Sequence, residues 1–213
     1  MNTDLIDSVT DNLISNGHRV FQIHRFAESD RAHVLRLAQW ADFKQSSKII
    51  DLGCGVGEVS KIMKEVRSDL NFTLVNISSV QLGYADEGFV KHCCNFCKVP
   101  EKDESFDGAM FLFSIGHSDI ARALQEAYRI LKEGGILFIY DMARTHGDNK
   151  NMESVSYQVD SKEQMINAAK NAGFTLDFYL EPSDRGGYGK SLFGNDFNIV
   201  FDGTIPAIWR LIK

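Results

Sequence analysis

The sequence predicts an α/β fold: a doubly wound, seven-stranded, mostly parallel sheet flanked by helices, with an antiparallel pair of strands at its C-terminal edge. Short apolar runs of strand length alternate with longer segments whose apolar residues recur at helical spacing. Glycine follows the first strand at every second position, at Gly53, Gly55 and Gly57. The two strand-like runs at the C-terminus have little between them, which favours antiparallel pairing.

The length and composition predict one domain with a sizeable core. The chain has 213 residues, of which 44% are hydrophobic and 24% are charged. We expect a helical cover over residues 1–47 and an α/β core over residues 48–213. The net charge of −6 does not favour a nucleic-acid partner. No apolar run approaches the roughly 20 residues that cross a bilayer, and the N-terminus lacks a signal pattern, so we expect a cytoplasmic protein without membrane insertion.

The elements follow from periodicity and from the residues that end each run. Residues 20–26 are expected to form a loop or a short strand between two N-terminal helices, and Ser78 is expected to cap a short helix. The pair Gly134 and Gly135 is expected to end the helix over residues 119–132. Helices are expected over residues 3–15, 30–43, 58–67, 78–86, 119–132 and 161–172, and strands over residues 48–52, 72–77, 90–94, 106–113, 136–140, 174–180 and 205–212.

The four cysteines lie in apolar or glycine-rich segments, at Cys54, Cys93, Cys94 and Cys97. Cys94 and Cys97 have the spacing of a metal or redox pair. No second pair or histidine cluster follows them, so we favour cysteines buried at a strand end and expect no metal. The spacing of all four suits reduced thiols rather than disulfides.

The glycine loop predicts a nucleotide-type ligand at the carboxyl ends of the strands. Its glycines allow a sharp turn and close approach of a ligand to the backbone. The dinucleotide fingerprint needs glycine where this chain has Glu58. Asp51, two residues before the first glycine, suits a ligand with a cationic end.

Three segments in this order resemble the class I S-adenosylmethionine-dependent methyltransferases: residues 51–57 (DLGCGVG), 105–107 (SFD) and 131–135 (LKEGG). The resemblance covers about residues 33–181. It implies the cofactor S-adenosyl-L-methionine, with Asp51 near its methionine end; the alternative is that Asp51 caps the turn. It also implies cofactor contacts from Gly53, Cys54, Gly55, Phe113 and Ser114.

Residues 75–81 (VNISSVQ) are similar to the branch of this family that methylates lipids, prenyl chains, sterols and other natural products. That resemblance implies cofactor contacts from Asn76, Ile77 and Gln81, with Asn76 and Gln81 near the ribose, although the family usually has an acid at position 76. Asn95 likewise stands where an acid faces the adenine, and Phe96 is expected against the adenine ring or else in the core. The two amides leave open a non-catalytic or regulatory relative. Asn76→Asp is expected to tighten ribose binding.

The candidate acid–base residues are His117 and Asp141, which follow the fourth and fifth strands. The alternatives are that His117 bonds to Asp119 at a helix start and that Asp141 caps a turn. Weaker candidates, chosen by position alone, are His146, Tyr157 and Glu181. His24 and Arg25 are expected to be a surface pair without a catalytic role.

Two polar segments are expected to border the substrate site, residues 142–160 as a lid or wall and residues 183–189 as a flexible loop. The compact chain favours a small-molecule substrate and a methyltransferase enzyme. A protein or RNA substrate is the other possibility for this fold, and the asparagine-proline-proline signature of one such group is not present at residues 113–116. The oligomeric state is left open.

Overall fold

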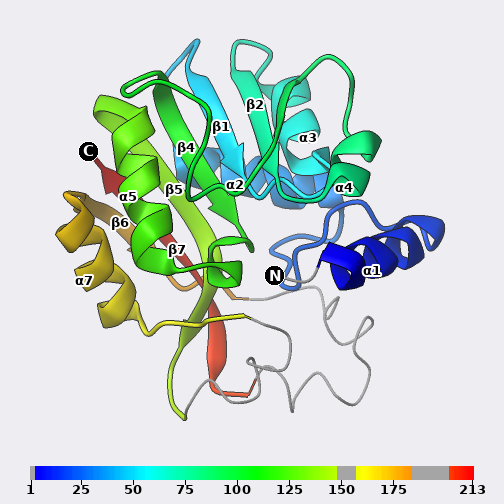
Figure 1. Cartoon of the computed structure of the whole chain (residues 1–213). Helices are drawn as coiled ribbons and strands as arrows, with labels where there is room; N and C mark the ends of the chain where they lie inside the picture. The colour runs from blue at the N-terminus through cyan, green and yellow to red at the C-terminus, as the bar shows by residue number, and fades with distance from the viewer. Residues whose placement is uncertain (1–2, 148–156, 184–201) are drawn as a thin grey trace.

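A computed structural model describes residues 3–147, 157–183 and 202–213 (Figure 1). The helices are α1 (Thr3–Ser15), α2 (Asp30–Ala41), α3 (Glu58–Val66), α4 (Ser79–Tyr84), the 3-10 helix η1 (Ile115–His117), α5 (Ile120–Ile130) and α7 (Lys162–Ala172). The strands are β1 (Lys48–Leu52), β2 (Asn71–Asn76), β3 (Val90–Cys93), β4 (Phe106–Leu112), β5 (Leu131–Arg144), β6 (Thr175–Leu180) and β7 (Thr204–Ile212).

The seven strands form one sheet in the order β3-β2-β1-β4-β5-β7-β6. The first five are parallel, and β7 lies antiparallel between β5 and β6. Ile208 of β7 is thus paired with Tyr140 on one side and with Leu180 on the other. The predicted seven-stranded, mostly parallel sheet with an antiparallel pair at its C-terminal edge is confirmed.

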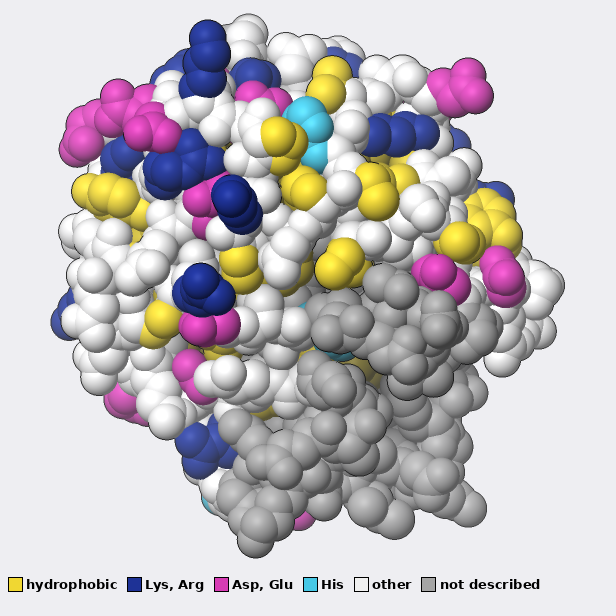
Figure 2. Space-filling view, viewed as in Figure 1, with side chains coloured by type: hydrophobic (Ala, Val, Ile, Leu, Met, Phe, Trp, Pro, Cys, Tyr) yellow, Lys and Arg dark blue, Asp and Glu magenta, His cyan; other side chains and the backbone are white. Residues whose placement is uncertain are grey.

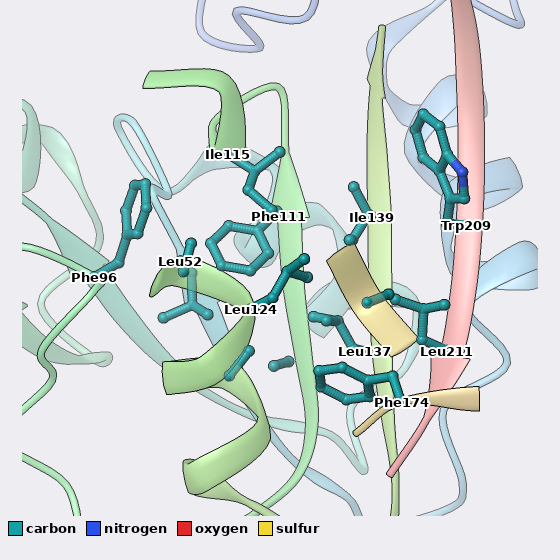
Figure 3. Packing of buried hydrophobic residues seen from close by; sticks show 14 of the residues in the cluster. Leu52, Phe96, Phe111, Ile115, Leu124, Leu137, Ile139, Phe174, Trp209 and Leu211 are labelled. Carbon is teal, nitrogen blue, oxygen red and sulfur yellow. The ribbon is translucent and has the colours of Figure 1, made fainter. Parts of the chain in front are cut away.

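Helices cover both faces of the sheet, and each face has its own apolar core. On one face, side chains from β1, β4 and β5 pack against α5 and α7 (Figure 3). Phe111 and Leu137 are fully buried at its centre. On the other face, the sheet packs against α2 and α3, with Leu37 and Met63 fully buried. This two-sided burial explains the nearly continuous apolar composition of the central strands.

The fifth strand differs most from expectation. Helix α5 ends at Ile130, and Leu131 already belongs to β5, where it pairs with Phe106. Both side chains are fully buried, so packing outweighs the helical periodicity that continued to residue 132. Gly134 is therefore not a helix terminator: it lies within β5 with φ +70°, where the β4–β5 register is irregular.

The N-terminal segment packs over one end of the sheet. Helix α2 lies against α3, residues 20–26 form a loop, and Figure 1 shows α1 beside α4 beyond the carboxyl ends of β1 and β2. The expectation of a surface pair at His24 and Arg25 is wrong, because both side chains are buried. Arg25 donates a 2.7 Å hydrogen bond to the Val20 carbonyl and pairs with Asp30 at 3.0 Å, which compensates its burial.

Within the described residues, we find no helix that is both long and apolar enough to span a membrane. Of the predicted polar segments, residues 148–156 and 184–189 lie outside the described part of the chain.

Candidate functional site

A pocket of about 200 Å³ lies at the carboxyl ends of β1, β2 and β4. The loop between β1 and α3 forms its floor, and the N-terminal loop contributes one wall. Its lining residues are Arg19, Phe21, Gln22, Asp51, Gly53, Cys54, Gly55, Val56, Glu58, Val59, Asn76, Ile77, Gln81, Phe96, Leu112, Phe113, Ser114 and His117. Strand ends of this kind are where doubly wound sheets bind ligands.

The glycine loop has the conformation that its sequence predicts. Gly53, Gly55 and Gly57 have φ values of +87°, +56° and +74°, which side chains on L-residues disfavour. A Cβ added to Gly53 would lie 2.5 Å from the Ser114 Cβ, so β1 and β4 can approach only with glycine there. At Gly55 an added Cβ would first meet the Phe21 ring, at 3.6 Å, across the pocket. Glycine at position 53 thus allows the segments after β1 and β4 to pack closely, and glycine at position 55 leaves the space beside the pocket open.

Asp51 brings a buried carboxylate to the pocket. Ser60 of α3 donates a 2.7 Å hydrogen bond to its Oδ2, whereas Oδ1 has no partner among the described residues. Burial raises the pKa of Asp51 to about 7, and the Ser60 bond opposes that shift. An unpaired carboxylate oxygen in this position favours a ligand that brings a hydrogen-bond donor or a positive charge.

Asn76, at the end of β2, connects the glycine loop to α4. Its amide nitrogen donates to the Gly55 carbonyl at 3.0 Å and to Gln81 Oε1 at 2.6 Å. Its Oδ1 accepts the backbone N–H of Ile77 at 2.8 Å. Gln81 in turn donates to Thr10 Oγ1 at 2.6 Å, which fastens α1 to this side of the pocket. The amide is therefore required by the architecture and is not a weakened carboxylate.

Phe96 and Asn95, which were both expected near the adenine, occupy different environments in the structure. Phe96 is buried, lines the pocket and packs edge-on against Phe111 at 5.3 Å, so it is both a wall residue and a core residue. Asn95 is exposed and is not among the described pocket-lining residues. Its Oδ1 accepts the Cys97 N–H at 2.8 Å, which stabilises the turn after β3. Its predicted contact with adenine remains a prediction.

His117 lines the pocket and lies beside Tyr157, one of the weaker acid–base candidates. Its half-buried ring packs edge-on against Tyr157, with 4.5 Å between centroids. Gly116 lets the two segments meet, because an added Cβ would lie 2.2 Å from the Tyr157 ring. Asp119 caps α5, because its Oδ1 accepts the Arg122 N–H at 3.2 Å.

Asp141 does not line the pocket, so the structure places it behind the site rather than in it. Its buried Oδ1 accepts hydrogen bonds from Tyr157 Oη at 2.5 Å and from the Met142 N–H at 2.7 Å. Burial raises its pKa to about 7, while these bonds and the amides of Ser114 and Ile115 favour the charged form. Through these contacts Asp141 holds the wall that carries His117, and its predicted role as an acid or base stays untested.

Sequence reasoning missed the contribution of the N-terminal loop. Arg19, Phe21 and Gln22 line the pocket, although their segment has no periodic pattern or motif that signals it. Glu58 and Val59 were also missed, and their place in the first turn after the glycine loop could have indicated them. Two weaker candidates lie elsewhere: His146 is exposed near Asp202, and Glu181 is exposed and accepts a bond from Tyr179.

The four cysteines do not come together in one site. Cys54 lines the pocket, and burial followed by the charge of Asp51 raises its thiol pKa well above the usual range. Cys94 and Cys97 are half-buried against the core beside β3, as expected in outline, and Cys93 is exposed. All four are free.

The sheet order, the glycine loop and the pocket define the class, which is an α/β protein built to hold a nucleotide-like ligand at the topological switch between β1 and β4. Residues 50–139 match a family model described as a methyltransferase domain. The chain therefore contains a methyltransferase domain, and its fold is that of S-adenosylmethionine-dependent methyltransferases.

Curated relatives and solved structures agree with this family. The chain is 29% identical over 172 residues to squalene methyltransferase 1 of Botryococcus braunii, covering 70% of this chain and 45% of the relative. It is 30% identical over 210 residues to sterol 24-C-methyltransferase ERG6B of Gibberella zeae, covering 90% and 53%. The chain thus spans about half the length of the curated relatives it matches.

Two solved structures show the same fold. The cyclase SpnF superimposes with a TM-score of 0.83 at 20% identity, covering 99% of this chain and 94% of that one. Geranyl diphosphate C-methyltransferase from Streptomyces coelicolor, solved with S-adenosyl-L-homocysteine, gives a TM-score of 0.70 at 14% identity, covering 85% and 78%. At these identities the likeness concerns the fold alone.

The pocket fits the cofactor of this family. S-adenosylmethionine carries an ammonium and a sulfonium, and the unpaired Oδ1 of Asp51 offers a matching negative charge. The open side of Gly55 gives a ligand access to backbone, and Phe96 offers an apolar face for a base. Ten of the eleven residues predicted to contact the cofactor line this one pocket, and Asn95 is the exception.

Proposed function

We propose that the chain binds S-adenosylmethionine and transfers its methyl group to a small, apolar, isoprenoid-like acceptor. The observation that carries this proposal is the buried, half-paired Asp51 carboxylate on the glycine loop of a methyltransferase domain. The names of several relatives, among them squalene, botryococcene and sterol methyltransferases, support the acceptor class. Transfer to carbon is the favoured chemistry, since several of these names specify a C-methyltransferase.

The residues of the chain can meet the demands of this reaction. S-adenosylmethionine, when bound, supplies a methyl group that is already activated by the positive charge on its sulfur. Catalysis then depends mainly on positioning and on keeping water out. Leu112, Phe113 and Phe21 give the pocket apolar walls, and Phe113 is braced edge-on by Tyr140 at 4.8 Å. We assign to His117, which lines the pocket, the removal of the proton that the acceptor loses after its carbon or oxygen is methylated.

The Asn76 network argues against a degraded cofactor site. The Asn76 amide donates two hydrogen bonds, to the Gly55 carbonyl and to Gln81 Oε1, and a carboxylate at this position could donate neither. We therefore favour a catalytic member of the family. On the face shown in Figure 2, basic and acidic side chains are interspersed, which suits a small-molecule acceptor better than a nucleic acid. The four free cysteines suit the reducing cytoplasm, the location that we propose.

Methyl transfer from isotope-labelled S-adenosylmethionine to a panel of acceptors tests the proposal. The panel contains linear triterpenes, sterols and prenyl diphosphates, together with a protein lysate and total RNA. We expect label in an apolar isoprenoid and its loss in His117→Ala, while binding of the cofactor to that variant is kept. Label that enters only protein or RNA would overturn the acceptor class, and cofactor binding without any transfer would favour the regulatory alternative.

A further inference from the structure

The N-terminal loop carries a second unsatisfied polar group at the pocket, in Gln22. This side chain is only 3% exposed and belongs to the pocket wall. Its amide nitrogen, Nε2, has no hydrogen-bond partner among the described residues. A buried amide without a partner is unfavourable, and such groups in folded proteins are usually satisfied by water or by a ligand.

His33 fixes which end of the Gln22 amide is unsatisfied. The backbone N–H of Phe26 can only donate, and it lies 3.2 Å from His33 Nδ1, so that nitrogen must be the unprotonated acceptor. The proton of the neutral ring then lies on Nε2, which is 2.5 Å from Gln22 Oε1 and donates to it. The Gln22 oxygen is therefore used, and its NH₂ group is directed away from His33.

His33 is itself held firmly. It is fully buried on α2, and its ring packs against Phe26 with 5.2 Å between centroids and against Tyr140 with 5.9 Å. The Tyr140 hydroxyl donates to the His24 carbonyl at 2.8 Å, which ties the same loop to β5. The direction of the Gln22 amide is thus set by the core and not by a flexible surface.

The pocket therefore carries two complementary unsatisfied groups. Gln22 supplies a neutral donor, and Oδ1 of Asp51 supplies an anionic acceptor. The amino-acid end of S-adenosylmethionine carries a carboxylate, which needs donors, and an ammonium, which needs acceptors. A donor and an acid in one pocket match that pair of charges.

Arg19 is the rival partner for the carboxylate, because it is cationic and also lines the pocket. Its side chain is exposed, so water screens its charge and competes for its donors. Gln22 is shielded from water, and its orientation is already fixed before a ligand arrives.

We propose that Gln22, oriented by His33, donates a hydrogen bond to the carboxylate of the cofactor's methionine end and so makes the N-terminal loop a selective part of the cofactor site. This inference rests on the proposed function, because it assumes that the pocket holds S-adenosylmethionine. It assigns the loop a binding role that the glycine motif does not include.

Binding calorimetry with two ligands tests it: S-adenosyl-L-homocysteine and its decarboxylated analogue, which keeps the amine. The main variant is Gln22→Glu, which retains an oxygen for His33 and replaces only the NH₂ group. Gln22→Met removes the donor without adding charge. Gln125→Glu makes the same charge change at an exposed position of α5.

We expect the wild type to prefer S-adenosyl-L-homocysteine over the decarboxylated ligand. Gln22→Glu should weaken binding of the former at least tenfold and change binding of the latter less than threefold, and Gln22→Met should lower the preference about tenfold. Gln125→Glu should match the wild type. Thermal unfolding without ligand verifies that each variant is folded.

Three results would overturn the inference. These are equal losses for both ligands in the Gln22 variants, a wild type that has no preference, and loss of the preference in Arg19→Met but not in Gln22→Met. Each of them leaves the proposed function standing, because the wild type still binds. A wild type that binds neither ligand would instead overturn the proposed function itself, and this inference with it.

Discussion

The hydroxyl of Tyr157 donates a 2.5 Å hydrogen bond to Asp141 Oδ1 in the interior of the protein. This bond fastens the chain that leads into α7 to the β5 strand. The Gln158 N–H donates to the Gly116 carbonyl at 2.7 Å and adds a second attachment beside it. The wall that carries His117 is therefore supported from behind by a buried acid that does not itself reach the pocket.

Tyr157→Phe should lower the free energy of unfolding by about 2 kcal/mol at pH 8, because a buried carboxylate loses a charge-assisted donor. The pKa of Asp141 is about 7, so the carboxyl is mostly protonated at pH 5 and the loss there should be smaller. Urea unfolding at both pH values measures the difference. Tyr84→Phe is the control: its bond to Asp11 is exposed, and its effect should stay within about 0.5 kcal/mol. Equal losses at the two pH values would contradict the pairing.

Gly53→Ala should be far more destabilising than Gly134→Ala. Both glycines have positive φ, +87° and +70°, which costs an alanine about 1–2 kcal/mol in either place. Only at Gly53 does the added methyl group collide, with Ser114, whereas nothing lies within 4 Å at Gly134. We expect a loss above about 3 kcal/mol at Gly53, measured by urea unfolding. Similar losses for the two variants would show that the close approach of β1 and β4 is not what requires glycine.

Asn76→Asp should weaken the site, which reverses the expectation from sequence. An aspartate cannot donate to the Gly55 carbonyl or to Gln81 Oε1, and it would place negative charge beside both oxygens. We expect a loss of about 2–4 kcal/mol in stability and weaker cofactor binding. Thermal unfolding and calorimetry check both effects. Tighter binding in a fully stable variant would restore the view that the family's acid belongs here.

Cofactor binding should strengthen as pH rises through about 7. Burial raises the pKa of Asp51 to about 7, so its carboxylate is mostly protonated at pH 6 and mostly ionised at pH 8. Since the ligand ammonium needs the ionised form, the Kd for S-adenosyl-L-homocysteine should fall about tenfold over that interval. Asp51→Asn should bind weakly and with little dependence on pH. An unchanged Kd in the wild type would mean that Asp51 does not face the ammonium.

The raised pKa of Asp51 has the opposite effect on the stability of the ligand-free protein, which falls as pH rises. The stabilisation from protonated Asp51 is fully present below its unfolded pKa near 3.8 and is lost as pH rises through about 7. The protein therefore gives up stability to keep a charged group ready at neutral pH, and bound ligand should recover it.

The glycine loop and the cap of α4 could be predicted, because each depends on residues that are close together in the sequence. The glycine spacing fixed the loop conformation, and with it the positions of Asp51, Gly53 and Gly55, because positive φ angles leave few other solutions. Ser78 was predicted as the cap of α4 for the same local reason, and its hydroxyl accepts the Gln81 N–H at 3.0 Å.

The parts that depend on distant contacts were not predictable. Gln22 enters the pocket because His33 and Tyr140 anchor an irregular loop, and no periodicity marks such a loop. Asp141 lies near the carboxyl ends of the strands, where the sequence predicted a site residue. Its hydrogen-bond partner Tyr157 is 16 residues away in the chain, and this bond makes Asp141 a support for the wall that carries His117. Likewise, the direction of the Asn76 amide depends on Gly55 and Gln81, which belong to other elements.

Titration of the purified protein with S-adenosylmethionine in a calorimeter at pH 8 tests the central claim most directly. Gly55→Val is the matched variant, since its branched side chain would stand beside the pocket, where only Phe21 lies within 4 Å of an added Cβ. We predict saturable binding of one cofactor per chain to the wild type and none to a folded Gly55→Val. Absence of binding to the wild type at millimolar cofactor would contradict the account.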